Sequence, residues 1–271
     1  MRHASRMPMP PPRKRPPPRS ARAEPIGAAP STPRHGVARA LSKRGVCSRT
    51  QAAEWVREGR VAVNGRTVRD PEHPVRPGSD RLALDGRDLA EARRVYLALN
   101  KPRGLVTTAR DERGRDTVYT CLAGADLPWL APVGRLDQAS EGLLLMSNDP
   151  AWAAAITDPA TGPDKTYHVQ VDAVPDAALL ASLMAGRSDG GDFLRATSAT
   201  LLRNGNRNAW LEIVLSEGRN RQIRRLLALH GLGVLRLIRV AIGPLALGEL
   251  PKGQWRALSD AEAAALAPLS P

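Results

Sequence analysis

Residues 134–146 read Gly-Arg-Leu-Asp-Gln-Ala-Ser-Glu-Gly-Leu-Leu-Leu-Met, a glycine-flanked loop that runs directly into an apolar segment. The apolar segment, 143–146, has the length and character of a buried strand. Arg135 and Asp137 stand two positions apart in the loop before it. A carboxylate at the end of a buried strand, with a cation nearby, can be kept ionised for chemistry. Taken alone, the loop favours a simpler interpretation, in which Asp137 caps a turn and Arg135 is its surface ion-pair partner.

Two further segments change this interpretation. Residues 165–169 read Lys-Thr-Tyr-His-Val, and residues 217–225 read Glu-Gly-Arg-Asn-Arg-Gln-Ile-Arg-Arg. With residues 134–146, they resemble the three signature segments of ribosomal RNA pseudouridine synthases, in the branch that modifies single sites in small- or large-subunit rRNA. The resemblance extends from about residue 36 to about residue 258.

Length, composition and charge agree with an RNA partner. A chain of 271 residues can form one medium domain and a small one, and 42% hydrophobic residues support a core. The net charge of +13 predicts a polyanionic partner. Most of this charge lies early in the chain: +7 in residues 1–34, +4 in 35–93 and +2 in 94–271.

Several functional classes are disfavoured. Cys47 and Cys121 form neither a disulfide framework nor a metal-ligand cluster. His168 and His230 lack partners at ligand spacing, so we expect no metal. No apolar run approaches the roughly 18–20 residues that span a bilayer, and no secretory signal is visible. We expect a soluble, cytoplasmic monomer that uses neither a membrane nor a nucleotide cofactor.

The chain is predicted to divide into four segments. Ten prolines among the first 34 residues indicate a disordered tail, which either adds diffuse phosphate affinity or has no specific role. The four predicted segments are a basic Pro-rich tail (1–35), a small RNA-binding module (36–93), a catalytic domain (94–262) and a C-terminal tail (263–271).

The small module has a readable order of elements. Helical spacing at 37–41 is followed by a capping box at 48–51 that opens a second helix. The Asn-Gly pair at 64–65 predicts a type I′ hairpin turn, and a last strand covers 82–84. This order resembles the S4 RNA-binding domain.

Basic residues cluster on the two predicted helices of the module. Arg39 and Lys43 lie four residues apart, a like-charged spacing that costs an isolated helix about a few tenths of a kcal/mol. This spacing favours phosphate contacts over a merely solvated face. We therefore expect RNA contacts from Arg39, Lys43, Arg44, Arg49 and Arg57.

The larger segment predicts an α+β domain with a largely antiparallel, mixed sheet, because many strands are joined by hairpins and helices are interspersed. No glycine-rich nucleotide fingerprint is present. The main predicted elements are strands at 143–146, 166–171 and 234–242, the last of these being the final strand, and helices at 176–185 and 219–230.

The resemblance implies a cofactor-free isomerisation. The bond from ribose C1′ to uracil N1 breaks, the base turns, and C5 joins C1′. This requires an ionised carboxylate at the sugar and a target base flipped into a dry pocket. By resemblance, Asp137 is the catalytic carboxylate.

Further site residues follow from the same resemblance. Tyr167 matches the aromatic residue of a Lys-x-Tyr motif, which can stack on the uracil and reach the proton at C5; the alternative is a core tyrosine beside Val169. Arg224 matches the position whose guanidinium pairs with the catalytic carboxylate and keeps it charged. Leu237 or Ile238 is expected to form the floor of the uracil pocket. Expected RNA contacts in this domain are Lys101, Arg103, Arg135, Arg221 and Arg225.

Three functions remain open at this point. The leading one is an rRNA uridine isomerase acting on rRNA or a subunit assembly intermediate, with 23S rRNA favoured over 16S. The rivals are a non-catalytic rRNA-binding assembly factor, and a synthase acting on tRNA or several RNAs. Intact Asp137, Tyr167 and Arg224 argue against the first rival. Arg221 argues against the second, since multi-substrate relatives carry His at that position.

Overall fold

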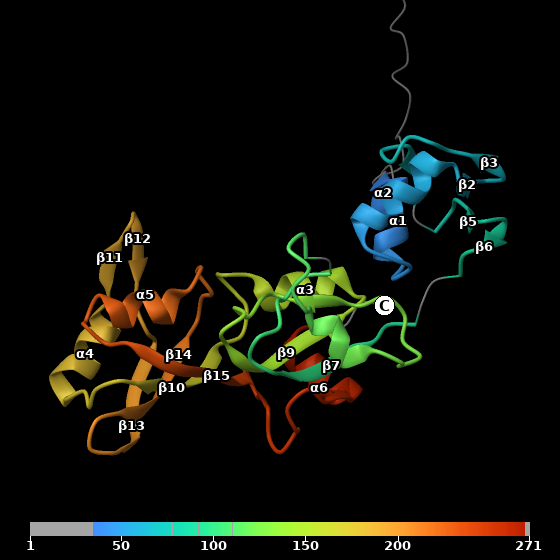
Figure 1. Ribbon diagram of the computed structural model, residues 1–271. Helices are drawn as coiled ribbons and strands as arrows, with labels where there is room; N and C mark the ends of the chain where they lie inside the picture. Colours follow the sequence, from blue (N-terminus) through green and yellow to red (C-terminus); the bar gives the residue numbers. More distant parts are fainter. Residues whose placement is uncertain (1–34, 77, 91–92, 110, 269–271) are drawn as a thin grey trace, which may run out of the picture. The chain divides into compact units, whose positions relative to one another are not determined.

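The computed structural model describes residues 35–76, 78–90, 93–109 and 111–268 (Figure 1). The predicted tail 1–35 lies outside these residues except for His35. That residue belongs to the short strand β1 (His35–Gly36), which pairs with β4 (Pro74–Val75), so the module begins one residue earlier than predicted.

The module contains the predicted helices and hairpin. Ser48 caps the second helix by accepting a hydrogen bond from the Gln51 amide (3.1 Å), and Gly59 ends it in the left-handed conformation. The helices pack on a four-stranded antiparallel sheet of order β3-β2-β5-β6. The elements are α1 (Val37–Lys43), α2 (Arg49–Glu58), β2 (Val61–Val63), β3 (Arg66–Thr67), β5 (Leu82–Leu84) and β6 (Arg87–Asp88).

Two similar turns shape this sheet. Asn64 and Gly65 have φ values of 50° and 79°, as a type I′ turn requires. Asp85 and Gly86 repeat the same values, so the chain turns back there and adds β6. The prediction ended the module's sheet at β5 and missed this second hairpin.

The larger domain is built on a nine-stranded sheet, which confirms the predicted α+β class. The main path runs β13-β14-β10-β15-β9-β7-β17, with β16 beside β15 and β8 beside β9; the β15–β9 pair is parallel and the others are antiparallel. The strands are β7 (Tyr96–Lys101), β8 (Ala131–Val133), β9 (Glu141–Ser147), β10 (Lys165–Val171), β13 (Ser198–Asn204), β14 (Ala209–Leu215), β15 (Val234–Ile242), β16 (Leu245–Ala246) and β17 (Trp255–Ala257).

Strand β9 is buried on both of its faces. Leu144 and Met146 join the core that includes β10, β14 and β15, whereas Leu143 and Leu145 join a second core with Trp152. A strand buried on both sides needs a continuous apolar sequence rather than an alternating one, which explains the apolar run at 143–146.

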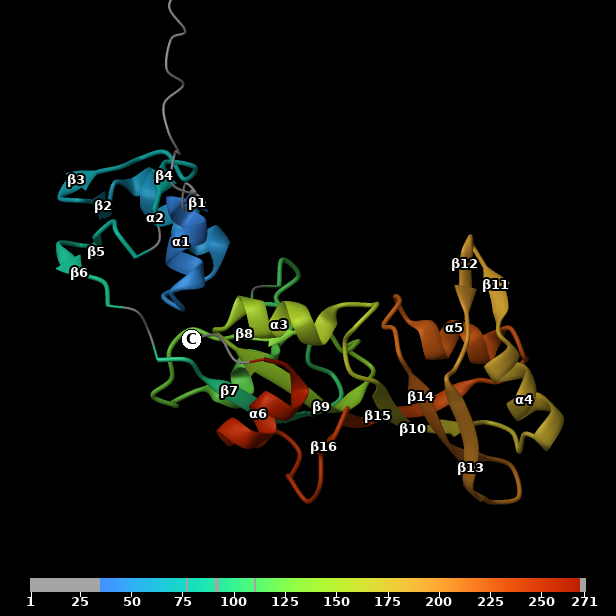
Figure 2. The same ribbon diagram turned by 180° about the vertical axis from the view of Figure 1, so that it is seen from behind.

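Helices complete the two cores. Figures 1 and 2 show α5 lying along one face of strands β10, β14 and β15, where Ile223, Leu226 and Leu227 enter the first core. The remaining elements are the 3-10 helix η1 (Val118–Leu122), α3 (Pro150–Thr157), α4 (Ala177–Ala185), the hairpin β11 (Arg187–Asp189) and β12 (Asp192–Leu194), α5 (Gln222–Ala228) and α6 (Asp260–Leu266).

The end of the chain differs from the prediction. A tail was predicted for residues 263–271, but α6 continues to Leu266, and both Ala263 and Leu266 are buried in the second core. The indole Nε1 of Trp152 donates to the Ala263 carbonyl (2.9 Å). The domain therefore continues past residue 262; residues 269–271 lie outside the described residues. The strand at 234–242 is also followed by two short strands that were not predicted, β16 and β17.

The helix predicted for 219–230 is shorter than expected. α5 begins at Gln222, and Arg221 before it has φ 49°, in the left-handed region. Helical periodicity alone does not reveal a left-handed residue at a helix start. Arg219 and Arg221 consequently belong to the loop before α5, so Arg221 does not share a helix face with the arginines that follow.

Candidate active site

The three signature segments meet around one cavity of about 600 Å³. The loop 134–137 supplies one wall, the segment 217–224 supplies another, and β10 and β15 supply the base through Tyr167 and Leu237. These segments are far apart in sequence. The antiparallel pairs β10–β14 and β10–β15 and the parallel pair β15–β9 bring them together.

The loop that carries Asp137 is held by a buried lysine. The ammonium of Lys101 donates to the carbonyl oxygens of Pro102 (3.0 Å), Asp137 (3.3 Å) and Ser140 (2.8 Å). Its three protons thus meet three acceptors. Burial lowers the pKa of Lys101 to about 8.

This position corrects one prediction. Lys101 was expected to contact RNA, but its relative exposure is 0%. It therefore orders the loop from within the protein and offers no surface to a phosphate group.

Arg221 is the arginine that pairs with Asp137. Its Nη1 lies 3.8 Å from Oδ2 of Asp137, whose side chain is about one-third exposed. The prediction assigned this pair to Arg224. Because Arg221 adopts the left-handed conformation just before α5, it lies in the loop that borders the cavity, with its side chain reaching Asp137.

Arg224 instead binds backbone oxygens around the cavity. Its Nη2 donates to the Ala139 carbonyl (3.2 Å) and its Nη1 to the Val234 carbonyl (3.4 Å). Burial lowers the pKa of Arg224, the nearby Arg221 lowers it further, and the charge of Asp137 acts in the opposite direction. Arg224 thus remains within electrostatic reach of Asp137 while it connects the loop that carries Asp137 to β15.

Tyr167 lies on the cavity face of β10. It is 8% exposed and shares this face with Val169 and Val171, as the alternation of side chains along a strand requires. In the register of the sheet, Tyr167 stands opposite Arg239 and Val169 stands opposite Leu237. Leu237 lines the cavity, whereas the neighbouring residue of β15, Ile238, is not among the lining residues.

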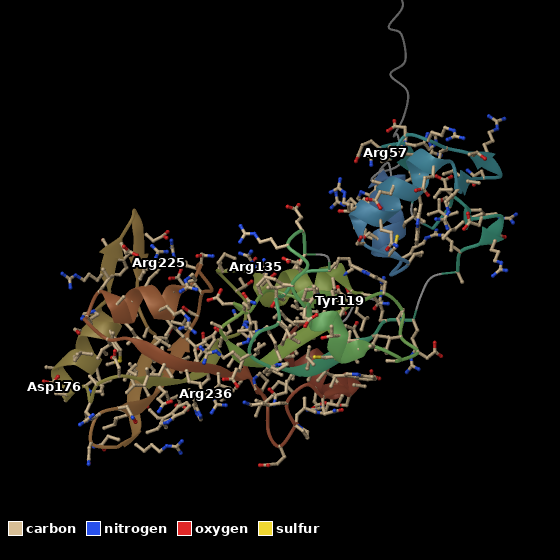
Figure 3. All side chains as sticks on the ribbon, viewed as in Figure 1. Arg57, Tyr119, Arg135, Asp176, Arg225 and Arg236 are labelled. Atoms are coloured by element: carbon tan, nitrogen blue, oxygen red, sulfur yellow. The ribbon has the colours of Figure 1, made fainter. Side chains whose placement is uncertain are left out.

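Arg225 has a structural partner. It forms ion pairs with Asp189 (2.6 Å) and Asp192 (2.8 Å), which hold the β11–β12 hairpin to α5. Figure 3 shows Arg225 at α5, on the side of the sheet away from Arg236. Its charge is balanced within the protein, unlike the free RNA contact that was predicted.

The remaining predicted RNA contacts differ in exposure. Arg44 donates to the carbonyls of Leu89 (3.2 Å) and Asp80 (3.3 Å), and Lys43 lies 3.2 Å from a ring nitrogen of His35. Both are therefore partly used in holding the module. The exposed members are Arg39, Arg49, Arg57, Arg103, Arg135 and Arg221.

Sequence reasoning missed a charged group at the start of β9. Glu141 is buried, and it accepts hydrogen bonds from Arg236 (2.8 and 3.1 Å) and pairs with Lys252 (2.6 Å). The bond to Arg236 is the main cause that lowers the pKa of Glu141 to about 2. The sequence did contain a signal for this group: a carboxylate stands two residues before the apolar run at 143–146.

Family models match both parts of the chain. A model described as RNA pseudouridylate synthase matches residues 95–229, and a model of the S4 domain matches residues 37–80. None of the described helices combines the length and the apolar character that crossing a bilayer would require.

Individual relatives agree with these models. An uncharacterized RNA pseudouridine synthase of Aquifex aeolicus is 37% identical over 228 residues, which cover 83% of this chain and 91% of that protein. The ribosomal large subunit pseudouridine synthase B of Bacillus subtilis is 35% identical over 225 residues, covering 82% and 91%. A crystal structure of a pseudouridylate synthase matches 86% of this chain and all of that chain, with a TM-score of 0.59 and 28% identity.

Proposed function

The chain belongs to the RNA pseudouridine synthase family, and from this premise we propose that it isomerises one specific uridine of ribosomal RNA to pseudouridine. The observation that carries the proposal is the cavity in which Asp137, Tyr167 and Leu237 line one space. The S4 domain supplies a second RNA-binding part. The name of the Bacillus relative favours the large-subunit rRNA as substrate.

Asp137 acts at the ribose of the flipped nucleotide. Its carboxylate lines the cavity, with Nη1 of Arg221 3.8 Å from Oδ2. An ionised carboxylate can serve as nucleophile or as electrostatic partner when the bond from C1′ to N1 breaks. The Lys101 ammonium below the loop fixes the backbone at Asp137 and at Ser140.

Tyr167 and Leu237 hold the base. The ring of Tyr167 stacks on the uracil, and its hydroxyl takes part in removing the proton from C5 after the base has turned. Leu237 supplies an apolar floor from the neighbouring strand. Both residues are mainly buried, so they offer the base an apolar surface.

Exposed arginines bind the RNA backbone. In the S4 domain these are Arg39, Arg49 and Arg57, and at the cavity Arg135 and Arg221. Such contacts give affinity and register rather than sequence selectivity. We place the enzyme in the cytoplasm, where rRNA and subunit assembly intermediates are accessible to it.

A non-catalytic assembly factor is the second candidate. Asp137 argues against it, because a surface that only binds RNA gains nothing from a carboxylate at the wall of its cavity. A 16S-specific synthase differs from the favoured 23S enzyme only in target, and the same experiment distinguishes them.

Mapping of pseudouridines in both rRNAs tests the proposal. In a strain that lacks this gene, one 23S position should lose its pseudouridine, and the wild-type gene should restore it while Asp137→Asn should not. Loss of a 16S position would move the target to the small subunit. Unchanged modification in every rRNA would refute the proposed substrate.

A further inference from the structure

The cavity wall carries more positive than negative groups. Its two acids already have basic partners: Asp137 pairs with Arg221, and Glu217 pairs with Arg219. Among the described residues, four of the wall cations have no carboxylate partner within ion-pair distance: Arg135, Lys165, Arg224 and Arg239. The basic groups at the wall are Arg135, Lys165, Arg219, Arg221, Arg224 and Arg239.

Arg239 has a buried donor that is unused. Its side chain extends from β15, is 5% exposed, and is anchored where Nε donates to the Leu143 carbonyl (2.7 Å). Its Nη2 is fully buried and has no hydrogen-bond partner among the described residues. A buried donor left unpaired costs about 1–3 kcal/mol, and more when it is charged. Because Arg239 lines the cavity, a shift of its guanidinium toward a bound ligand would give this donor the missing acceptor.

Lys165 lies on the same side of the sheet. It precedes Tyr167 by two positions on β10, so the two side chains share the cavity face. Arg239 stands directly opposite Tyr167 on the neighbouring strand. Burial lowers the pKa of Lys165, and the charge of Arg239 lowers it further. Two cations without a carboxylate partner among the described residues therefore flank the ring on which the base is proposed to stack.

We propose that Arg239 and Lys165 form an oxygen-binding subsite that stabilises the uracil as an anion after its bond to the ribose breaks. The inference rests on the proposed function and assigns a further pair of catalytic residues to it. Arg239 is buried and Lys165 is half-buried, which suits the carbonyl oxygens of a flipped base, whereas Arg135 is exposed and suits a phosphate group.

The chemistry balances without an added reactant. When the C1′–N1 bond breaks, its electron pair leaves with the base, and the negative charge spreads over N1 and the carbonyl oxygens O2 and O4. Donors placed where this charge develops lower the barrier. The base then turns, and an electron pair of the anion forms the bond from C5 to C1′. A base removes the C5 proton, the role proposed for the Tyr167 hydroxyl, and N1 takes up a proton, so the product is an isomer of the substrate. Because O2 and O4 flank N3 symmetrically, one of them can face the subsite before and after the turn.

The test uses the full-length enzyme and a transcript of the rRNA segment that the mapping identifies. Arg239→Gln and Lys165→Gln are compared with Arg207→Gln, an exposed cation outside the cavity wall. We expect the single-turnover rate at saturating enzyme to fall about 100-fold or more for each cavity variant, by analogy with removal of one oxyanion donor. RNA affinity, from filter binding, should change less than about threefold, because the contacts form with the anion.

A second RNA separates catalysis from a structural role. It carries 5-fluorouridine at the target, and fluorine stabilises the base anion, so the enzyme has less charge to stabilise. The rate defect of Lys165→Gln, measured as consumption of that nucleotide in nuclease digests, should be smaller on this RNA. Equal defects on both RNAs would overturn the inference.

Folding is controlled independently. Arg239→Lys keeps the charge and should recover part of the rate that Arg239→Gln loses, with both melting temperatures recorded. A Lys165→Gln enzyme with wild-type single-turnover rate, or one that loses only RNA affinity, would also overturn the inference. If wild-type enzyme converts no uridine, the proposed function itself fails; normal wild-type activity with an unaffected Lys165→Gln refutes only the subsite.

Discussion

At the scale of single residues, the two arginines near Asp137 differ in exposure and in their contacts. Arg221 is 3.8 Å from the carboxylate and more than half exposed, so it remains able to meet RNA as well. Arg224 is half-buried and bonded to two carbonyls. Arg221 therefore acts mainly through its charge beside Asp137, and Arg224 mainly through its hydrogen bonds to the backbone.

Asp137→Asn should abolish isomerisation. The substitution preserves shape but removes the charge that the chemistry at C1′ requires, so we expect the single-turnover rate to fall by several orders of magnitude, about 1.4 kcal/mol of barrier for each tenfold. Melting temperature and RNA affinity should stay near wild type. A rate within about tenfold of wild type would exclude Asp137 as the catalytic group.

Tyr167→Phe should bind RNA normally and turn over slowly. The phenyl ring still fills the cavity and stacks, but the hydroxyl needed at the C5 proton is absent. Filter binding and single-turnover kinetics measure the two effects separately. Normal turnover would reduce Tyr167 to a packing residue of the core that it shares with Val169.

Arg221→Gln and Arg224→Gln should differ in stability. Removing Arg224 breaks two hydrogen bonds to carbonyls around the cavity, which we expect to lower the free energy of unfolding by about 1–3 kcal/mol. Arg221→Gln, at an exposed position, should change it by less than about 0.5 kcal/mol. Urea denaturation measures both values, and equal losses of stability would contradict the assigned roles.

At the scale of elements, β9 connects the two cores and carries the site at its start. Gly142 makes the β9–β15 contact possible, since a Cβ there would collide with the Arg239 carbonyl, and its φ of +100° also excludes most other residues. Glu141, the preceding residue, links β9 to Arg236 and Lys252. The strand is thus positioned by backbone fit and by one buried charge cluster.

Glu141→Gln should make folding less sensitive to acid. The pKa of Glu141 lies at about 2 in the folded protein, below the ordinary value of 4.5. The unfolded state therefore binds more protons between these values. The contribution of ionised Glu141 to the free energy of unfolding is therefore fully present above about pH 4.5 and is lost as pH falls toward 2.

The measurement is the difference in unfolding free energy between wild type and Glu141→Gln at pH 7 and pH 3. We expect the wild-type advantage at pH 7 to shrink at pH 3. The matched control is Glu249→Gln, which changes an exposed acid in the loop before Lys252. Its unfolding free energy should differ little from that of wild type at either pH. An advantage that does not change with pH would show that the Glu141 charge contributes nothing to folding.

At the scale of the whole molecule, charge and chemistry occupy different parts of the sequence. Residues 1–93 carry a net charge of +11, whereas residues 94–271 carry +2 and contain every proposed catalytic residue. Phosphate binding by many cations releases counterions, so log affinity falls with log salt in proportion to the number of phosphates neutralised. The early part of the chain should therefore dominate the salt dependence.

Deletion of residues 1–93 should weaken rRNA binding and flatten its salt dependence while leaving residual activity on a short RNA. A full-length variant with Gln at Arg39, Arg49 and Arg57 tests the S4 domain alone. Its salt slope should fall by about 0.7–0.9 for each phosphate that is no longer neutralised. An unchanged slope in both proteins would place the phosphate contacts in the larger domain.

Local sequence patterns determined most of the elements and the location of the site. The strand predicted at 166–171 corresponds to β10, the Asn-Gly pair at 64–65 predicted the β2–β3 hairpin, and the capping box at 48–51 predicted the start of α2. These signals act within a few residues of the chain. The signature segments similarly indicated Asp137 and Tyr167.

The tertiary structure alone decided how the charged groups are used. Lys101 is buried because three backbone carbonyls from the turns after β7 and before β9 converge on its ammonium, and Arg225 is neutralised by a hairpin more than thirty residues earlier in the chain. The left-handed Arg221, rather than Arg224, reaches Asp137. Whether a cation faces solvent, RNA or a carbonyl depends on partners brought together by long-range strand pairing, and spacing along the chain does not encode those distances.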